Sequence, residues 1–204
     1  MLTRRQFLPV AAASVTLPTL LGAQPAFAAV DPLLLAREGD RVLGKAEAPI
    51  TIVEYASFTC PHCAHFANKV LPEVKKNWVE TGKAKLVYRD FPLDRVAYEA
   101  AILARAVPGD RYFAFIDTLF AQQEKWATAK DTKAALSQLA KLAGLGASDI
   151  DAAFANKVVG DAILAQRLEA AEKLKVDSTP TLFINGKKAD HGTYESFSKA
   201  LSAA

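Results

Sequence analysis

Cysteine is scarce in this sequence, which has two cysteines among 204 residues. A small protein held together by several disulfides is therefore excluded. Glycine and proline are also too few, at 10 each, for a collagen-like repeat. What the chain does have is 51% hydrophobic and 23% charged residues. These proportions exclude a disordered chain or a coiled coil and indicate one or two ordinary globular domains.

Acidic residues are missing from residues 1–28, where an arginine pair at positions 4 and 5 is followed by Phe-Leu and a long apolar run. This pattern predicts a secretory signal peptide. The arginine pair resembles a twin-arginine export signal, and Ala-Phe-Ala at 26–28 predicts cleavage after Ala28. An uncleaved membrane anchor is the alternative. It is less favoured because a span needs about 20 apolar residues, and Pro9 and Pro18 interrupt this run.

Loss of this segment changes what the charge implies. The formal net charge of +3 falls to +1 once Arg4 and Arg5 are removed. A nearly neutral protein has no electrostatic reason to bind nucleic acid or a membrane surface, so neither is expected as a partner. We expect an exported, periplasmic protein, in a compartment where thiols are oxidised and stay oxidised.

Both cysteines fall in one short motif, Cys60-Pro61-His62-Cys63. The run before it, 50–57, is apolar and rich in β-branched residues, which predicts a strand buried on both faces. After the motif, apolar residues recur at helical spacing as far as Trp78. The cysteines are therefore predicted to lie where a central strand turns into a helix.

This position predicts a reactive thiol at Cys60. A helix N-terminus offers unpaired N–H groups and partial positive charge, and Pro61 suits the first helical turn. Thiolate is the reactive form of cysteine, and the helix dipole contributes at most about 2 kcal/mol toward it. We expect hydrogen bonds to sulfur and the charge of His62 to lower the pKa of Cys60 further. Cys63, one turn further on, is expected to be the resolving thiol.

Three other interpretations of the motif are weaker. A purely structural disulfide closing so short a loop would stabilise the fold very little. A zinc site could draw on Cys60, His62, Cys63 and His65, but adjacent positions at a helix start do not converge tetrahedrally on one ion. A covalent haem needs histidine directly after Cys63, where the chain has alanine. We therefore expect neither a metal nor a cofactor.

A second signal lies far along the chain, at 178–188. Asn185-Gly186 between two short strand-like runs predicts a type I′ hairpin. Pro180 enters the first of these runs, and its bond to Thr179 is a candidate cis peptide.

A strand, CPHC at a helix start, a distant Thr-Pro before a hairpin and a last helix at 194–201 together resemble the thioredoxin fold. The CPHC motif and a long helical stretch between the halves resemble the DsbA-like thiol-disulfide oxidoreductases over 42–204. The resemblance implies that Cys60 is the attacking cysteine, Cys63 its buried partner and Pro180 a cis-proline. It further implies that Thr179 binds the backbone of a peptide substrate. Glu54 would lie behind the disulfide and accept the proton of Cys63.

The predicted architecture is an α/β thioredoxin fold with an inserted α-helical domain. We expect thioredoxin-like segments at 29–93 and 160–204 and the insertion at 94–159. Helices are predicted at 96–106, 112–122, 132–143, 150–155 and 161–175, with Asp131 and Ser148 as cap residues. Four aromatic residues of the insertion are expected to form its core: Phe113, Phe115, Phe120 and Trp126.

The predicted function is the introduction of disulfides into periplasmic proteins by exchange through Cys60 and Cys63. The expected partners are reduced, dithiol-containing proteins and a DsbB-type membrane quinone reductase, and the protein itself is expected to be a monomer. A disulfide isomerase or reductase is the first alternative, although few residues precede position 50 to hold the oligomerisation domain usual in isomerases of this fold. A non-catalytic peptide-binding module is the second.

Overall fold

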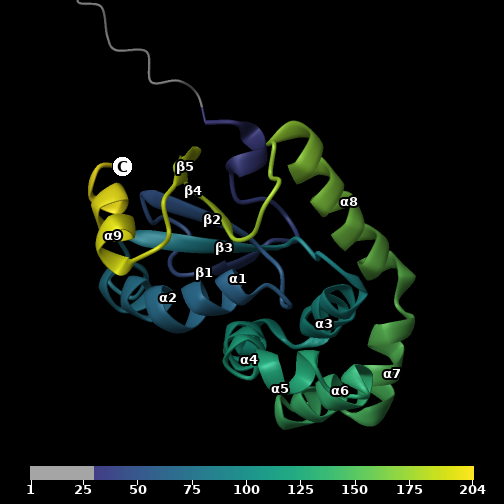
Figure 1. The fold of residues 1–204 in the computed structure, drawn as a ribbon. Helices are drawn as coiled ribbons and strands as arrows, with labels where there is room; N and C mark the ends of the chain where they lie inside the picture. Colours follow the sequence, from purple (N-terminus) through teal and green to yellow (C-terminus); the bar gives the residue numbers. More distant parts are fainter. Residues whose placement is uncertain (1–29) are drawn as a thin grey trace, which may run out of the picture.

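A mixed five-stranded sheet forms the centre of the protein in the computed structural model, which describes residues 30–204 (Figure 1). The predicted signal peptide and its cleavage site lie outside the described residues. The strand order is β1-β3-β2-β4-β5, with β2 and β3 parallel and the other neighbours antiparallel. The strands are β1 Arg41–Leu43, β2 Ile50–Ala56, β3 Ala84–Asp90, β4 Thr181–Ile184 and β5 Lys187–Ala189.

Strand β2 is central, as its apolar sequence predicts. Its residues alternate between the two faces of the sheet, so Ile52 packs in one hydrophobic cluster and Val53 in another. The predicted hairpin after β4 is also confirmed. Asn185 and Gly186 have φ angles of 44° and 83°, and positive φ at both central residues defines a type I′ turn.

One long helical segment follows Cys60 and covers one face of the sheet (Figure 1). It consists of α1 Pro61–His65, a π-helical turn, α2 Leu71–Val74 and a second π-helical turn that ends at Val79. The predicted helix is therefore confirmed, whereas the π turns were not predicted. Apolar side chains of this segment, Phe66 and Val74 among them, are buried against Ile52 of β2.

Five helices lie between β3 and α8, at the lower right of Figure 1. They are α3 Arg95–Ala106, α4 Gly109–Ala121, α5 Gln123–Ala127, α6 Thr132–Leu142 and α7 Ala147–Ala155. The Asp131 cap is confirmed, because its carboxylate accepts a hydrogen bond from the Ala134 N–H. The Ser148 cap is wrong: α7 begins after Gly146, and the Asp149 carboxylate accepts from the Gly146 N–H. Helix α5 is too short for apolar periodicity to reveal it.

Helix α8, Lys157–Lys173, leads back to the sheet and begins four residues earlier than predicted because Asn156 caps it. The last helix, α9 Tyr194–Ser202, lies beside α2 (Figure 1). No helix within residues 30–204 is both long enough and apolar enough to cross a membrane.

The helical region and the sheet share one hydrophobic core. Phe58 and Tyr88 from the sheet side pack in the same cluster as Phe115, Phe120 and Trp126. These last three aromatic residues are buried, as predicted. Phe113 differs from the prediction, because it is only half-buried and bridges this cluster and the one beneath the long helical segment. The domain boundaries remain a prediction.

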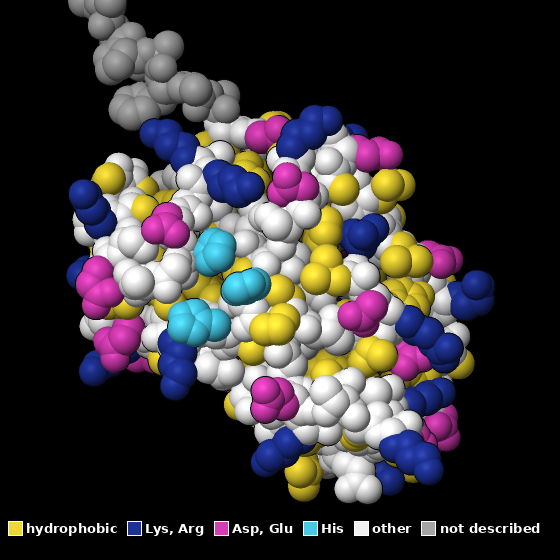
Figure 2. Space-filling model, in the orientation of Figure 1, with side chains coloured by type: hydrophobic (Ala, Val, Ile, Leu, Met, Phe, Trp, Pro, Cys, Tyr) yellow, Lys and Arg dark blue, Asp and Glu magenta, His cyan; other side chains and the backbone are white. Residues whose placement is uncertain are grey.

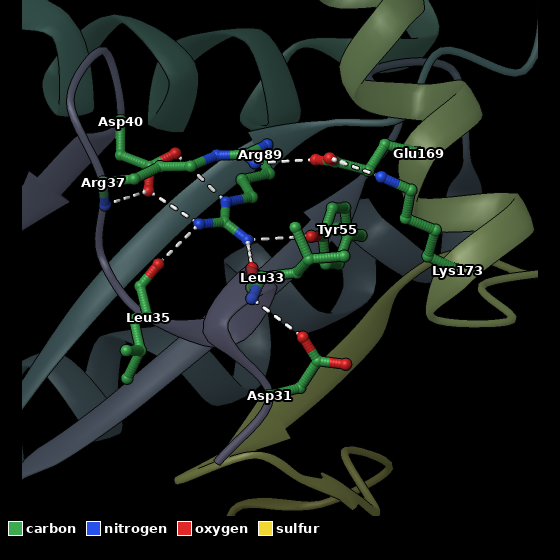
Figure 3. Close-up of polar contacts among 9 residues, drawn as sticks. All are labelled: Asp31, Leu33, Leu35, Arg37, Asp40, Tyr55, Arg89, Glu169 and Lys173. Atoms are coloured by element: carbon green, nitrogen blue, oxygen red, sulfur yellow. Dashed lines mark hydrogen bonds and ion pairs between the residues drawn. The ribbon is translucent and has the colours of Figure 1, made fainter.

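The opposite face of the sheet is organised by Arg89, whose side chain is completely buried (Figure 3). Its guanidinium forms an ion pair with Asp40 at 2.7 Å and donates a hydrogen bond to the Tyr55 hydroxyl at 2.8 Å. It also donates to the carbonyl oxygens of Leu33 and Leu35. Arg89 thereby attaches the chain before β1 to the sheet.

Candidate functional site

The two cysteines lie where β2 passes into the long helical segment. Cys60 is the N-cap residue of α1 and Pro61 is its first residue, as the sequence predicts. The pairing of β4 with β2 brings the segment before β4 to the same end of the sheet. There the Cys60 thiol donates a hydrogen bond to the carbonyl oxygen of Thr179 at 3.2 Å. The bond between Thr179 and Pro180 is cis.

Gln123 of α5 holds the backbone that carries Cys60. Its side-chain amide is buried and donates to the carbonyl oxygens of Phe58 and Cys60 at 2.8 and 2.9 Å. This contact could not be predicted from the sequence, because a lone glutamine 63 positions after Cys60 carries no local signal. Through this contact the inserted helices hold the loop that carries Cys60.

Asp94 supports the same loop from the start of α3. Its carboxylate accepts a hydrogen bond from the Thr59 hydroxyl at 2.6 Å and another from the Ala97 N–H at 2.8 Å. One side chain therefore caps a helix and restrains the residue before Cys60. Asp94 was also missed, although an acidic residue before an apolar-periodic run is a recognisable cap signal.

The pKa of Cys60 is lowered from its ordinary value of 9.0 to about 5. The largest cause is a hydrogen bond from the Cys63 thiol, and burial opposes it. The Thr179 side chain and the backbone N–H groups of Cys63 and His62 lower the pKa further. Cys60 is thus a thiolate at neutral pH, stabilised by donors that converge on its sulfur.

His62 contributes to this effect by its backbone N–H group. Its side chain is exposed, and the imidazole charge expected from the sequence is not among the causes that lower the pKa of Cys60. The role of the imidazole therefore stays a prediction.

Cys63 is completely buried, and its sulfur accepts a hydrogen bond from the Ser57 N–H at 3.5 Å. Burial is the main cause that raises the pKa of its thiol, and the Cys60 sulfur raises it further. Both cysteines are in the free thiol form in this structure. The pKa values of two thiols one helical turn apart are therefore shifted in opposite directions.

Glu54 lies on β2, close enough to act on the Cys63 thiol, with 1% of its surface exposed. Both carboxylate oxygens are buried and have no hydrogen-bond partner among the described residues. Loss of hydration raises the pKa of Glu54 to about 8, although Lys75 opposes the shift. The carboxyl group can therefore hold or release a proton near neutral pH. It is buried, as its apolar sequence context predicts.

The surface around the site is open on the side of α4 and α5. A cavity of about 390 Å³ lies beside Pro61 and His65 and is walled by residues 120–125. The chain's three histidines gather on this face of the molecule (Figure 2). Within residues 30–204, no group of three or more His, Cys, Asp or Glu side chains is arranged to hold a metal ion.

The chain is similar to proteins of the thioredoxin family and to solved DsbA structures. A family described as thioredoxin matches residues 36–203. A crystal structure of a variant of alpha-DsbA1 from Wolbachia pipientis is 30% identical, with a TM-score of 0.76, and the match covers 84% of this chain and 92% of that one. The oxidised BdbD of Bacillus subtilis is 22% identical with a TM-score of 0.74, covers 81% and 92%, and supports the fold alone.

Curated sequences named for disulfide chemistry also match. A putative protein-disulfide oxidoreductase from Rickettsia bellii is 30% identical over 82% of this chain and 65% of its own length. A probable disulfide bond formation protein D from Bacillus anthracis is 27% identical over 78% of this chain and 75% of its own length. The matches span just under two thirds of the length of the first curated relatives.

Proposed function

Because the chain belongs to the thioredoxin family and, within it, to the DsbA-like proteins, we propose that it is an exported thiol-disulfide oxidoreductase that introduces disulfide bonds into periplasmic proteins. The observation that carries this proposal is the contrast between the two sulfurs. Cys60 has a lowered pKa and Cys63 a raised one. A stabilised thiolate favours the reduced enzyme, which makes the Cys60–Cys63 disulfide an oxidant.

The reaction begins when a substrate thiolate attacks Cys60 of the enzyme disulfide. The bond to Cys63 breaks, a mixed disulfide forms at Cys60, and Cys63 leaves as a thiolate that takes a proton. The second substrate thiolate then attacks the substrate sulfur of the mixed disulfide, and Cys60 leaves as a thiolate. The substrate has lost two electrons and gained a disulfide, and the enzyme holds two cysteines in reduced form.

The remaining site residues have roles that fit this sequence of steps. Glu54 supplies the proton that Cys63 takes, because its carboxyl group is buried, holds a proton near neutral pH and acts on the Cys63 thiol. Pro61 is the first residue of the helix that begins after Cys60, and the backbone N–H of His62 stabilises the Cys60 thiolate. Thr179 and Pro180 lie against Cys60. There the backbone of an extended substrate peptide can form hydrogen bonds with the backbone of Thr179, as in the addition of a strand to a sheet.

Turnover requires a partner that removes the two electrons. A DsbB-type membrane quinone reductase fits this need, and the other partners are reduced, dithiol-containing proteins. The signal peptide predicted at 1–28 exports the enzyme to the periplasm. The protein acts there as a monomer.

Ribonuclease refolding tests the proposal. The protein from residue 29, in its disulfide form, is expected to oxidise reduced ribonuclease and restore its activity, whereas the Cys60→Ser variant is not. Rescue of scrambled ribonuclease by the dithiol form alone would replace the proposal with an isomerase. Absence of exchange with either substrate would leave only a peptide-binding module.

A further inference from the structure

Four buried side chains with unpartnered polar atoms gather on one side of the sheet. They are Glu54, Tyr88, Asp90 and Tyr112, and among the described residues the atoms concerned have no hydrogen-bond partner. Buried polar atoms without a protein partner are normally bonded to internal water. A cluster of them therefore indicates a polar region within an otherwise apolar core.

The strand register places three of the four on a common face. Glu54 of β2 is opposite Tyr88 of β3, and Ala56 is opposite Asp90. Side chains two positions apart on a strand point to the same face, so Glu54, Tyr88 and Asp90 form a row across the two strands. Tyr112 of α4 covers the row, with its ring centroid 6.3 Å from that of Tyr88.

The row has one end at the cysteines and the other at a cavity. Glu54 is close enough to Cys63 to act on its thiol, and Cys63 has no exposed surface. At the far end, the Asp90 carboxylate accepts a hydrogen bond from Arg105 at 2.7 Å. Arg105 and Arg41 line an open cavity of about 700 Å³. The Arg41 guanidinium also lies 4.9 Å from the centre of the Tyr112 ring.

The exchange reaction creates a need for such a connection. When the bond between the two cysteines breaks, the electron pair goes to Cys63, and burial makes its thiolate unfavourable. The proton that Cys63 takes from Glu54 must then be replaced, yet neither residue reaches the solvent. Burial raises the pKa of both tyrosines, so they keep their O–H groups at neutral pH.

We propose that Tyr88, Tyr112 and Asp90, together with internal water, conduct protons between Glu54 and the cavity at Arg105. This inference rests on the proposed function. One proton enters from the cavity for each proton that Glu54 gives to Cys63, and it leaves by the same path in the reverse reaction. The three residues position the proton and do not touch the substrate.

Lys75 and Asp117 are the other charged groups that act on the Glu54 carboxyl group. They are bound to each other at 2.6 Å, with side chains that are 18% and 45% exposed, and neither has a buried, unpartnered polar atom of the kind found along the row. The tyrosine row is therefore the polar connection that the buried groups themselves indicate.

Rapid-quench kinetics test the proposal. The disulfide forms of the wild-type protein and of Tyr112→Phe are mixed with dithiothreitol at neutral pH, and formation of the dithiol form is followed. Loss of one link in a proton path is expected to slow the reaction about tenfold, because positioned proton transfer contributes roughly 10²-fold or more. The equilibrium constant with glutathione is expected to stay unchanged. Tyr88→Phe is a second variant with the same expectation.

Tyr55→Phe is the matched control, because Tyr55 is equally buried but lies in the cluster on the opposite face of the sheet. It is expected to react at the wild-type rate. Wild-type rates in both Tyr112→Phe and Tyr88→Phe would overturn the proton path. A slower reaction with an equal change in the equilibrium constant would also overturn it, since the tyrosine would then act on sulfur stability. A wild-type protein that does not react with dithiothreitol would instead refute the proposed function, and the path with it.

Discussion

The sulfur of Cys60 lies 3.2 Å from the carbonyl oxygen of Thr179, although 119 positions separate these residues in the chain. The Thr179 hydroxyl is buried and has no hydrogen-bond partner among the described residues. When Cys60 loses its proton, this hydroxyl is free to donate to the sulfur. A residue distant in sequence therefore helps to set the acidity of the candidate nucleophile.

Replacing Thr179 by valine is expected to raise the pKa of Cys60, because the side chain keeps its shape and loses its donor. His62→Ala is expected to raise the pKa less, because the backbone N–H that acts on the sulfur remains. The measurement is thiolate ultraviolet absorbance of the dithiol form as a function of pH. A larger change in His62→Ala than in Thr179→Val would show that the imidazole charge dominates, as expected from the sequence alone.

The stability of the dithiol form is expected to increase with pH relative to that of Cys60→Ser. The pKa of Cys60 falls from 9.0 in the unfolded chain to about 5 in the folded one. Its contribution is therefore complete above the unfolded pKa and is lost as the pH falls through the folded pKa. Urea unfolding in the presence of reductant measures both proteins across this range. A constant difference between them would contradict a lowered pKa.

Glu54 is expected to have the opposite effect, so that its contribution to the stability of the protein decreases as the pH rises. Burial raises its pKa from 4.5 to about 8, so the folded state binds the proton more tightly than the unfolded chain. The stability that comes from this tighter proton binding is fully present below the unfolded pKa and is lost as the pH rises through the folded pKa. A shift of this size corresponds to about 5 kcal/mol in the free energy of unfolding. The urea midpoint of Glu54→Gln is therefore expected to fall less than that of the wild type between about pH 5 and pH 8. If the urea midpoints of the two proteins change with pH in parallel, Glu54 is hydrated in the folded protein.

Arg89→Leu is expected to destabilise the protein by about 3–5 kcal/mol, because it leaves Asp40 charged and buried without a partner. The side chains of both residues are at most 1% exposed. Arg95→Leu is the matched control: Arg95 is 86% exposed in its pair with Glu99, and its loss is expected to cost about 0.5 kcal/mol or less. Urea denaturation compares the two. Equal losses would mean that Asp40 is hydrated when Arg89 is absent.

The features predicted from the sequence are those whose causes lie within a few residues. The apolar run of β2, the Asn185-Gly186 turn and the Asp131 cap each carry their physical cause locally. The contacts of Gln123 and Arg89 were not predicted, because their partners come from distant parts of the chain. The π turns also escaped prediction, since one extra residue in a helical turn leaves no mark in composition.

The burial of Glu54 could be predicted from its apolar neighbours, but the absence of any partner for its carboxylate could not. That property depends on Tyr88 and on α4, which come together only in the folded chain. The same holds for Asp94, whose two roles are visible only when the Thr59 loop lies against α3.

The unequal acidity of the two sulfurs also makes the dithiol protein a convenient target for labelling. At neutral pH a thiol-directed reagent meets a thiolate at Cys60, which is 5% exposed, and a protonated thiol at Cys63, which has no exposed surface. The chain has no third cysteine. A fluorophore or spin label would thus attach at a single position beside Thr179 without any engineered residue, and would report directly on what approaches that face.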